Sequence, residues 1–246
     1  AAGFSPEETV FTRQEHTDLL LRVGEQDCGT GLEREQTAVC DGLLTDEPGA
    51  ALVCFGEAFL QGFDALSWNY EADLARGLSA DSEAIRKIAA LSREIGIDIS
   101  FGFIERDSCA LAENGSIAHI YRRITAGWKA RACWEHPHYR EGNSVQVIDW
   151  HGKRLMFALC GDLWELPERF TDDADALIWP VYIDYSPEEW ANVRLEYALQ
   201  AARTGKHALM INSLDENAFG ACCDFESGGI RAELPMGEEG LLLVEI

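Results

Sequence analysis

Short apolar runs recur along the chain, and amphipathic segments separate several of them. Their length favours strands, some of which we expect to be buried on both faces of a sheet. The predicted strands are Leu19 to Val23, Ala51 to Phe55, Ile97 to Ile104, Val145 to Ile148, Leu155 to Leu159, Ala176 to Ile178, Ala208 to Ile211 and Leu241 to Val244.

Two segments carry the helical spacing of apolar positions together with end signals. The segment Ser82 to Ile95 is amphipathic, and Gly96 supplies the left-handed residue that ends a helix. Ser186 is a good N-cap, and Glu189 three residues later completes a capping box. We therefore predict a second helix that runs from Ser186 to about Arg203.

The segment Cys109 to Arg123 is predicted to be a hairpin, because Asn114-Gly115 is the strongest short turn signal in the chain. Strands and helices thus alternate, with hairpins inserted. This order predicts the α/β class, with a mixed sheet or a pair of sheets. The 246 residues contain no internal repeat and no Pro/Gly/Ser-rich linker, which favours a single domain.

Charge narrows the range of partners. Lys and Arg number 20 against 43 Asp and Glu, so the net charge of −23 opposes nucleic acid and anionic lipid alike. No apolar run approaches the roughly 18 residues of a membrane span. We expect a soluble globular protein that binds neither nucleic acid nor membrane.

Cysteine usage indicates a reducing compartment. The eight cysteines show no CxxC spacing, and a chain of this length needs no disulfides for stability. Residues 1–8 lack the charged start and apolar stretch of a signal peptide. The expected location is the cytoplasm, with most cysteines as free thiols.

Two apolar strands run directly into chemically capable residues. Cys160 ends the run that begins at Leu155 and is followed at once by Gly161, which suits a nucleophile on a sharp turn at a strand's carboxyl end. Glu57 follows Gly56 in the same way, and partial desolvation would raise its pKa toward that of a useful base. Read singly, Cys160 also fits a small buried hydrophobe and Glu57 an exposed helix cap.

Lysine is scarce, and Lys129 is the one that lies in an aromatic-rich loop. It follows Trp128, and Trp134-Glu135-His136-Pro137-His138-Tyr139 comes five residues later. A cation and a carboxylate among aromatic rings indicate an organised pocket.

At these residues the chain resembles the nitrilase superfamily of carbon-nitrogen hydrolases. The segments that carry the resemblance are 52–57 (Leu-Val-Cys-Phe-Gly-Glu), 158–168 (Ala-Leu-Cys-Gly-Asp-Leu-Trp-Glu-Leu-Pro-Glu), 135–142 and 190–212. The likeness runs from about residue 19 to 246. It implies one carbon-nitrogen hydrolase domain over residues 1–246, with residues 1–18 as an irregular N-terminal extension, and a four-layer α-β-β-α sandwich.

The resemblance also implies a thiol mechanism for a small amide or carbamoyl amine, or for a nitrile. Cys160 would form an acyl-enzyme, Glu57 would serve as general base, and Lys129 with the backbone N–H of Gly161 would hold the oxyanion. Glu135 would hold Lys129 or help to position substrate. This chemistry requires no metal and no organic cofactor. Relatives commonly pair through the helices beside the nucleophile, so we expect a homodimer or larger homo-oligomer.

Two departures from the family pattern affect the site. Many relatives carry the catalytic Lys directly after a Tyr-Arg pair, a place held here by Arg123, so assignment of the amine to Lys129 requires a longer loop. Arg123 is the alternative cation, although a planar guanidinium is not equivalent to an ammonium. The second departure is Gly161, where relatives often have a larger residue, and it should open space beside the thiol.

Other interpretations stay open at this point. Cys133, His136 and His138 could form a loop metal site of a metal hydrolase, although no second ligand cluster accompanies them. A non-catalytic binding or scaffold protein would also fit the displaced Lys, and acyl transfer to an amine would use the same residues as hydrolysis. The aromatic residues expected to line the substrate pocket are Trp164, Trp179 and Tyr182.

Overall fold

The structure is a computed structural model, and it describes residues 18–23, 50–63, 66–129, 138–171, 173–204 and 207–246. Two six-stranded sheets form its centre. The first sheet has the order β12-β1-β2-β3-β4-β5 and contains β1 (Asp18–Val23), β2 (Ala50–Cys54), β3 (Asp98–Phe103), β4 (Ser108–Glu113), β5 (Ser116–Arg122) and β12 (Gly240–Glu245). Its central strands β1, β2 and β3 are parallel, and its outer pairs are antiparallel.

The second sheet repeats this plan. Its order is β11-β10-β9-β8-β7-β6, and it contains β6 (Ile148–Trp150), β7 (Lys153–Phe157), β8 (Ala176–Val181), β9 (His207–Asn212), β10 (Cys222–Glu226) and β11 (Gly229–Leu234). Strands β7, β8 and β9 are parallel, and the remaining pairs are antiparallel. Every residue of β8 is buried, as expected for a continuous apolar strand in the middle of a covered sheet.

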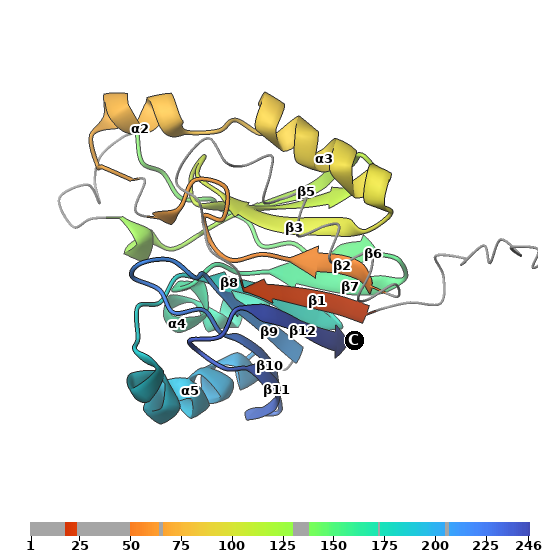
Figure 1. The fold of residues 1–246 in the computed structure, drawn as a ribbon, viewed down its shortest axis with the longest axis vertical. Helices are drawn as coiled ribbons and strands as arrows, with labels where there is room; N and C mark the ends of the chain where they lie inside the picture. The colour runs from red at the N-terminus through yellow and green to blue at the C-terminus, as the bar shows by residue number, and fades with distance from the viewer. Residues whose placement is uncertain (1–17, 24–49, 64–65, 130–137, 172, 205–206) are drawn as a thin grey trace, which may run out of the picture.

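Helices cover the outer face of each sheet. Helix α3 (Glu83–Ile95) contacts β3, β4 and β5, and α5 (Pro187–Ala202) contacts β9, β10 and β11. Shorter elements complete the layers: α2 (Tyr70–Arg76), α4 (Asp162–Glu165) and the 3-10 turns η2 (Ala126–Trp128) and η4 (Pro167–Phe170). The result is the four-layer α-β-β-α sandwich expected from the sequence (Figure 1).

Successive side chains along β2 point to opposite faces of the sheet, so they are divided between two cores. Leu52 and Cys54 point into the large core between the sheets, whereas Val53 and Phe55 join the core beneath α3. Both sets are buried, which explains why the strand is apolar without interruption. The strand is therefore held on both sides where it leads into Glu57.

The predicted helix ends are confirmed. The Ser82 side chain accepts a hydrogen bond from the backbone N–H of Ile85, and Gly96 closes α3 with a φ of 72°. Ser186 and Glu189 form the reciprocal capping box of α5.

The predicted hairpin is also confirmed. Its turn lies at Asn114 and Gly115, both with positive φ, between β4 and β5. The hairpin of β10 and β11 was not predicted, because β11 mixes charged and apolar residues and lacks an apolar run. Its turn residues Ser227 and Gly228 also have positive φ. The predicted strand Val145 to Ile148 is wrong in its limits, since β6 begins only at Ile148.

Cys54, Cys109, Cys160, Cys222 and Cys223, the cysteines in the described ranges, are free thiols, as expected. Across these same ranges, no helix combines the length and apolar character needed to cross a bilayer. Residues 1–17, which make up most of the expected N-terminal extension, lie outside the described residues.

Candidate active site

Cys160 lies on the sharp turn between β7 and α4. Its φ of 40° is unusual for a residue with a Cβ, so neighbouring contacts must hold the strained backbone. Its N–H donates to the carbonyl of Pro180 at 2.9 Å, and its carbonyl accepts from the Trp179 indole at 2.9 Å. The strand β8 thus fixes both sides of the turn.

The thiol of Cys160 differs from the other described thiols in its exposure. Cys160 is partly exposed, whereas Cys54, Cys109, Cys222 and Cys223 are buried. Burial raises the pKa of the Cys54 and Cys223 thiols well above the ordinary value and that of Cys109 to about 12. Burial keeps all four of these thiols away from solvent, which leaves Cys160 as the accessible thiol among the described residues.

Glu57 follows β2 on a tight turn that packs against β3. A Cβ at Gly102 in β3 would lie 2.5 Å from the Gly56 carbonyl oxygen, so only glycine permits this approach. The Glu57 carbonyl accepts from the Ser213 hydroxyl at 3.1 Å. The Glu57 side chain is completely buried, and desolvation raises its pKa well above the ordinary value, with the charges of Asp107 and Cys160 adding to the rise.

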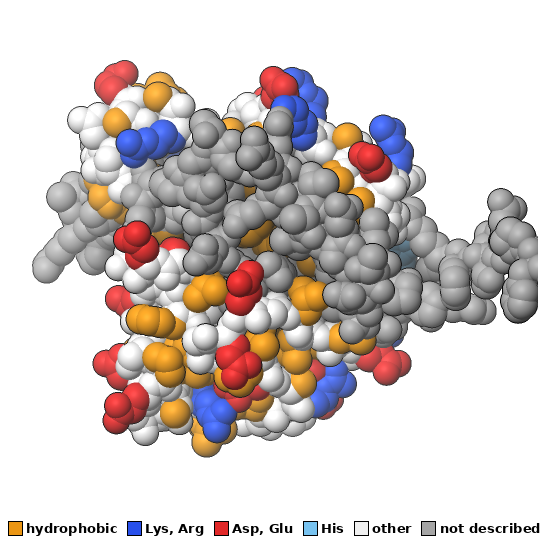
Figure 2. Space-filling model, viewed as in Figure 1, with side chains coloured by type: hydrophobic (Ala, Val, Ile, Leu, Met, Phe, Trp, Pro, Cys, Tyr) orange, Lys and Arg blue, Asp and Glu red, His pale blue; other side chains and the backbone are white. Residues whose placement is uncertain are grey.

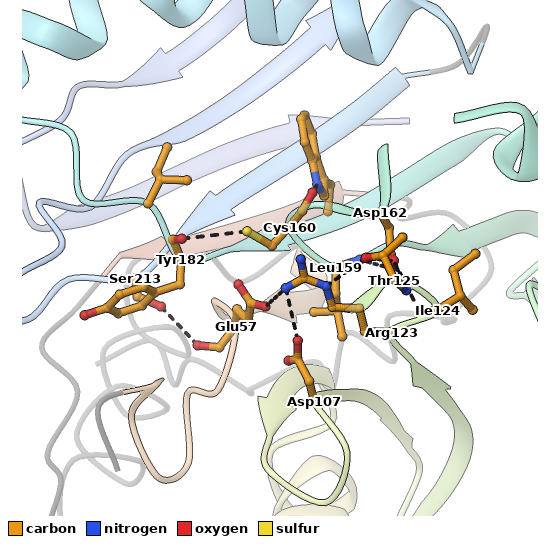
Figure 3. A network of polar contacts seen from close by, with 12 residues as sticks. Glu57, Asp107, Arg123, Ile124, Thr125, Leu159, Cys160, Asp162, Tyr182 and Ser213 are labelled. Carbon is orange, nitrogen blue, oxygen red and sulfur yellow. Dashed lines mark hydrogen bonds and ion pairs between the residues drawn. The ribbon is translucent and has the colours of Figure 1, made fainter. Parts of the chain in front are cut away.

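Arg123 is the cation that meets Glu57. It directly follows β5 and is 4% exposed. Its Nη1 lies 3.2 Å from Glu57 Oε1 and 3.3 Å from Asp107 Oδ2 (Figure 3). Burial by itself would lower the pKa of the guanidinium, but the charges of Cys160, Glu57 and Asp107 outweigh burial and raise it. The group is therefore a permanent positive charge inside the site.

Asp162 builds the frame around Arg123. Its carboxylate accepts from the Tyr121 hydroxyl at 2.6 Å and from the Thr125 hydroxyl at 2.8 Å, and it also accepts from three backbone N–H groups, those of Ile124, Thr125 and Leu159. The Thr125 hydroxyl in turn accepts from Arg123 Nε at 3.0 Å. Asp162 thus ties the end of β5 to the turn that carries Cys160.

Gly161 opens space beside the thiol, and the guanidinium occupies that space. A Cβ at Gly161 would overlap Arg123 Nη2, although the φ of −66° suits any residue. A Cβ at Gly127 would lie 3.1 Å from the same nitrogen and 2.7 Å from Glu165 Oε1. The two glycines therefore leave room for the planar fork of an arginine.

Lys129 lies at the end of η2, and its Nζ donates to the Tyr139 carbonyl at 3.1 Å and pairs with Glu141 at 2.5 Å. The charged neighbours that perturb the Glu57 pKa most are instead Asp107, Cys160 and Arg123. The structure brings Glu57 and Cys160 together with Arg123, the alternative cation of the sequence analysis. Glu135 lies outside the described residues, so its predicted role stays untested.

The three aromatic residues predicted for the substrate pocket have different surroundings. Tyr182 lies beside the thiol: its carbonyl is 3.7 Å from Cys160 Sγ, and its ring stacks on Phe63 at 4.9 Å. Trp179 is fully buried, and its indole supports the Cys160 carbonyl. Trp164 is 40% exposed and packs edge-on against Tyr197. Tyr182 is thus the one of the three whose contacts reach the thiol directly.

Sequence reasoning missed Asp107 and Asp162. Asp107 lies in the turn between β3 and β4, where a carboxylate is ordinary, and no local pattern links it to Arg123. In the sequence, Asp162 stands out only as part of the segment that contains Cys160. Its position two residues after Cys160 was the available signal, because a carboxylate there can accept hydrogen bonds from the N–H groups of the turn.

Of the three residues of the loop metal site predicted as an alternative, Cys133 and His136 lie outside the described residues. His138 stacks on Tyr70 at 3.8 Å. Elsewhere in the described ranges, Asp98, Glu113 and His151 have ligand atoms within 4.8 Å of one another. The Asp98 carboxylate there already accepts from the Trp150 indole and contacts His151, so these residues form a hydrogen-bonded cluster without need of an ion.

Comparisons with solved structures give the same fold. The carbon-nitrogen hydrolase from Helicobacter pylori G27 has a TM-score of 0.74 and 19% identity, with 94% of this chain and 89% of that chain covered. An amidase from Nesterenkonia sp. has a TM-score of 0.68 and 19% identity, with 94% and 90% covered.

The glutamine-dependent NAD+ synthetase from Acinetobacter baumannii is a larger neighbour, with a TM-score of 0.71 and 15% identity. The match covers 92% of this chain but only 45% of the synthetase, so the chain spans less than half of that protein's length.

No curated protein matches the sequence. The family model for carbon-nitrogen hydrolases matches residues 6–246. The chain therefore belongs to the carbon-nitrogen hydrolase family.

Proposed function

We propose that this enzyme hydrolyses the carbon–nitrogen bond of a small amide or carbamoyl amine, or of a nitrile, through a Cys160 acyl-enzyme. One observation carries the proposal: a partly exposed thiol, a buried carboxyl and a buried guanidinium meet although they come from three distant segments. A nucleophile, a base and an oxyanion partner are the groups that acyl transfer requires.

In the first step with an amide, the Glu57 carboxylate takes the proton of the Cys160 thiol as the sulfur attacks the carbonyl carbon. The carbonyl oxygen becomes an oxyanion, and the Arg123 guanidinium and the Gly161 N–H stabilise it. Removal of one such donor typically costs a factor of about 10²–10³ in kcat. Arg123 is already buried and oriented, so little reorganisation is needed when the charge develops.

In the second step, the carbon–nitrogen bond breaks and Glu57 returns its proton to the departing nitrogen. This leaves a thioester between Cys160 and the acyl group. Glu57 then takes a proton from water, the hydroxide oxygen attacks the thioester, and the acid leaves as the thiol is restored. An amine in place of water would give acyl transfer by the same route.

The contacts of Arg123 favour it over Lys129 as the active-site cation. Arg123→Ala should lower kcat about 10²-fold or more, since it removes a charge beside the reacting groups. Lys129→Ala should have the smaller effect on kcat, because the contacts of Lys129 to Tyr139 and Glu141 support the loop. A loss of turnover in Lys129→Ala with near-normal turnover in Arg123→Ala would reverse this assignment.

Structural neighbours support the thiol chemistry. A variant of the amidase from Nesterenkonia sp. AN1 carries the acetamide moiety of fluoroacetamide covalently at its active-site cysteine. A cysteine of the same fold therefore attacks a small amide reagent in that protein. For the present chain, Cys160 is the matching candidate on its strand-to-helix turn.

The test is a screen of small amides and nitriles, followed by mass analysis for an acyl adduct on Cys160. Cys160→Ala and Glu57→Gln should abolish turnover while the far-UV spectrum stays native. Full activity in either variant would refute the assignment. Loss of activity with a chelator but not with a thiol alkylator would favour the loop metal hydrolase, and binding without turnover would favour a non-catalytic binder.

A further inference from the structure

We propose that Asp107 is a positioning residue of the active site, which holds Arg123 in place and, as a second buried carboxyl on the same guanidinium nitrogen, opposes the ionisation of Glu57. The inference rests on the proposed function, since it concerns the base that activates Cys160. It assigns to Asp107 a role that neither the sequence motifs nor the order of the strands suggested.

The geometry links Asp107 to Arg123 through two contacts. Its Oδ2 lies 3.3 Å from Arg123 Nη1, and its carbonyl accepts the Arg123 backbone N–H at 3.0 Å. The same Nη1 reaches Glu57 Oε1 at 3.2 Å, so one nitrogen bridges both carboxyls. The two buried carboxyls are therefore held beside each other by one guanidinium nitrogen.

The charges around the pair oppose the simultaneous ionisation of both carboxyls. Both carboxyls are buried, and Arg123 is the positive charge beside them. Asp162 also faces Arg123, and because all its hydrogen-bond partners donate, it is held as a carboxylate. Two more full negative charges on Glu57 and Asp107 would exceed what one guanidinium can balance in a buried site.

The pKa shifts of Glu57 and Asp107 agree with this geometry. Desolvation raises the pKa of both carboxyls, that of Glu57 most, and the negative charge of Asp107 raises the Glu57 pKa further. Glu57 must lose its own proton before it can accept the proton of the thiol, and the charge of Asp107 opposes this loss. The thiolate that forms when Glu57 accepts the thiol proton is then balanced by Arg123.

The test measures the pH dependence of Cys160 alkylation by iodoacetamide, followed by peptide mass analysis so that other thiols do not interfere. Asp107→Asn should move the acidic limb of the alkylation rate down by about one pH unit or more, because it removes the charge that raises the Glu57 pKa. Asp107 has a φ of 58°, which Asn tolerates, so the turn should keep its shape. If that variant does not fold, Asp107→Gly also suits this backbone.

Glu105→Gln is the matched control. It removes a carboxylate from the same turn, but Glu105 pairs with Arg122 at 2.6 Å outside the buried cluster, so its profile should match the wild type. The loosened Arg123 should also lower kcat/KM of Asp107→Asn about 10²-fold on a substrate identified by the amide screen.

The outcomes separate the two proposals. If the Asp107→Asn profile coincides with the wild type while that of Glu57→Gln differs, the inference about Asp107 fails and the proposed function stands. If Glu57→Gln itself alkylates like the wild type, Glu57 is not the base and both proposals fall. A shift in Glu105→Gln equal to that in Asp107→Asn would also overturn the inference, because a general charge effect would explain it.

Discussion

An arginine inside an active site demands more of its neighbours than a lysine does. Its guanidinium is planar and wide, and each of its nitrogens needs a partner when buried. Here Nη1 meets two carboxyls and Nε meets Thr125, while Gly161 and Gly127 leave space for Nη2. The absence of a side chain at Gly161 and the presence of an arginine at position 123 are therefore sterically linked.

We predict that Gly161→Ala disrupts the site through Arg123 alone. The new Cβ would overlap Nη2 and displace the guanidinium from Glu57, so kcat should fall about 10²-fold, the usual cost of a misplacement near 1 Å. The measurement is steady-state turnover of a substrate found in the amide screen.

The control for this prediction is the same Gly161→Ala change made in the Arg123→Lys variant. A lysine lacks the forked end, so adding Gly161→Ala to Arg123→Lys should cost much less than it does in the wild type. A double-mutant cycle with no coupling energy between the two positions would contradict the steric account.

At the scale of elements, the site depends on strand exits. Glu57 follows β2, Arg123 follows β5 and Cys160 follows β7, and both β2 and β7 belong to parallel parts of the two sheets. Buried strands fix where these residues emerge. This is why the apolar runs, which sequence reasoning found, already pointed to Glu57 and Cys160.

The capping box of α5 is predicted to stabilise the layer beneath the second sheet. Ser186→Ala removes the acceptor for the Glu189 N–H and the partner of the Glu189 side chain, and should lower the free energy of unfolding by about 0.5–2 kcal/mol. Urea unfolding monitors the change. Ser82→Ala at the simpler cap of α3 should cost less, and an equal or larger loss there would contradict the role given to the reciprocal pair.

At the scale of the whole molecule, the buried carboxyl of Glu57 is expected to cost stability at neutral pH. Its pKa is raised on folding, so the native state binds more protons than the unfolded state above the ordinary Glu range near about pH 4.3. The contribution of the Glu57 carboxyl to the free energy of unfolding is fully present at low pH, and it is lost as the pH rises through the raised pKa.

Glu57→Gln should therefore raise the Tm relative to the wild type, and the difference should widen as pH increases. Thermal unfolding at several pH values measures this difference, with Glu105→Gln as the control that shows no such trend. A constant difference across the range would mean that folding does not perturb the Glu57 carboxyl.

Assembly is a second property of the whole molecule. Leu195 and Leu199 lie one turn apart on α5 and are 59% and 63% exposed, which is unusual for paired leucines and suits the predicted homo-oligomer. We predict that Leu195→Glu with Leu199→Glu lowers the mass measured by light scattering to that of a monomer. Leu74→Glu on α2, 59% exposed, is the matched control. An unchanged mass in the double variant would exclude this face as the contact.

The net charge of the chain affects how it meets charged substrates. Figure 2 shows acidic side chains scattered over the described part of one face, among exposed apolar groups and fewer basic ones. A net charge of −23 should slow the encounter with anionic substrates.

The sequence by itself determined the local features: the strands with long apolar runs, the two capped helices, the Asn114-Gly115 turn, and the placement of Glu57 and Cys160 at strand ends. Each follows from spacing or backbone preference within a few residues. The sequence alone could not decide between Arg123 and Lys129, which lie only six positions apart in the same connection. The pairing of Arg123 with Glu57 joins residues 66 positions apart, and Asp107 enters from another turn. Such contacts depend on the order of strands in a sheet, which only the tertiary structure specifies.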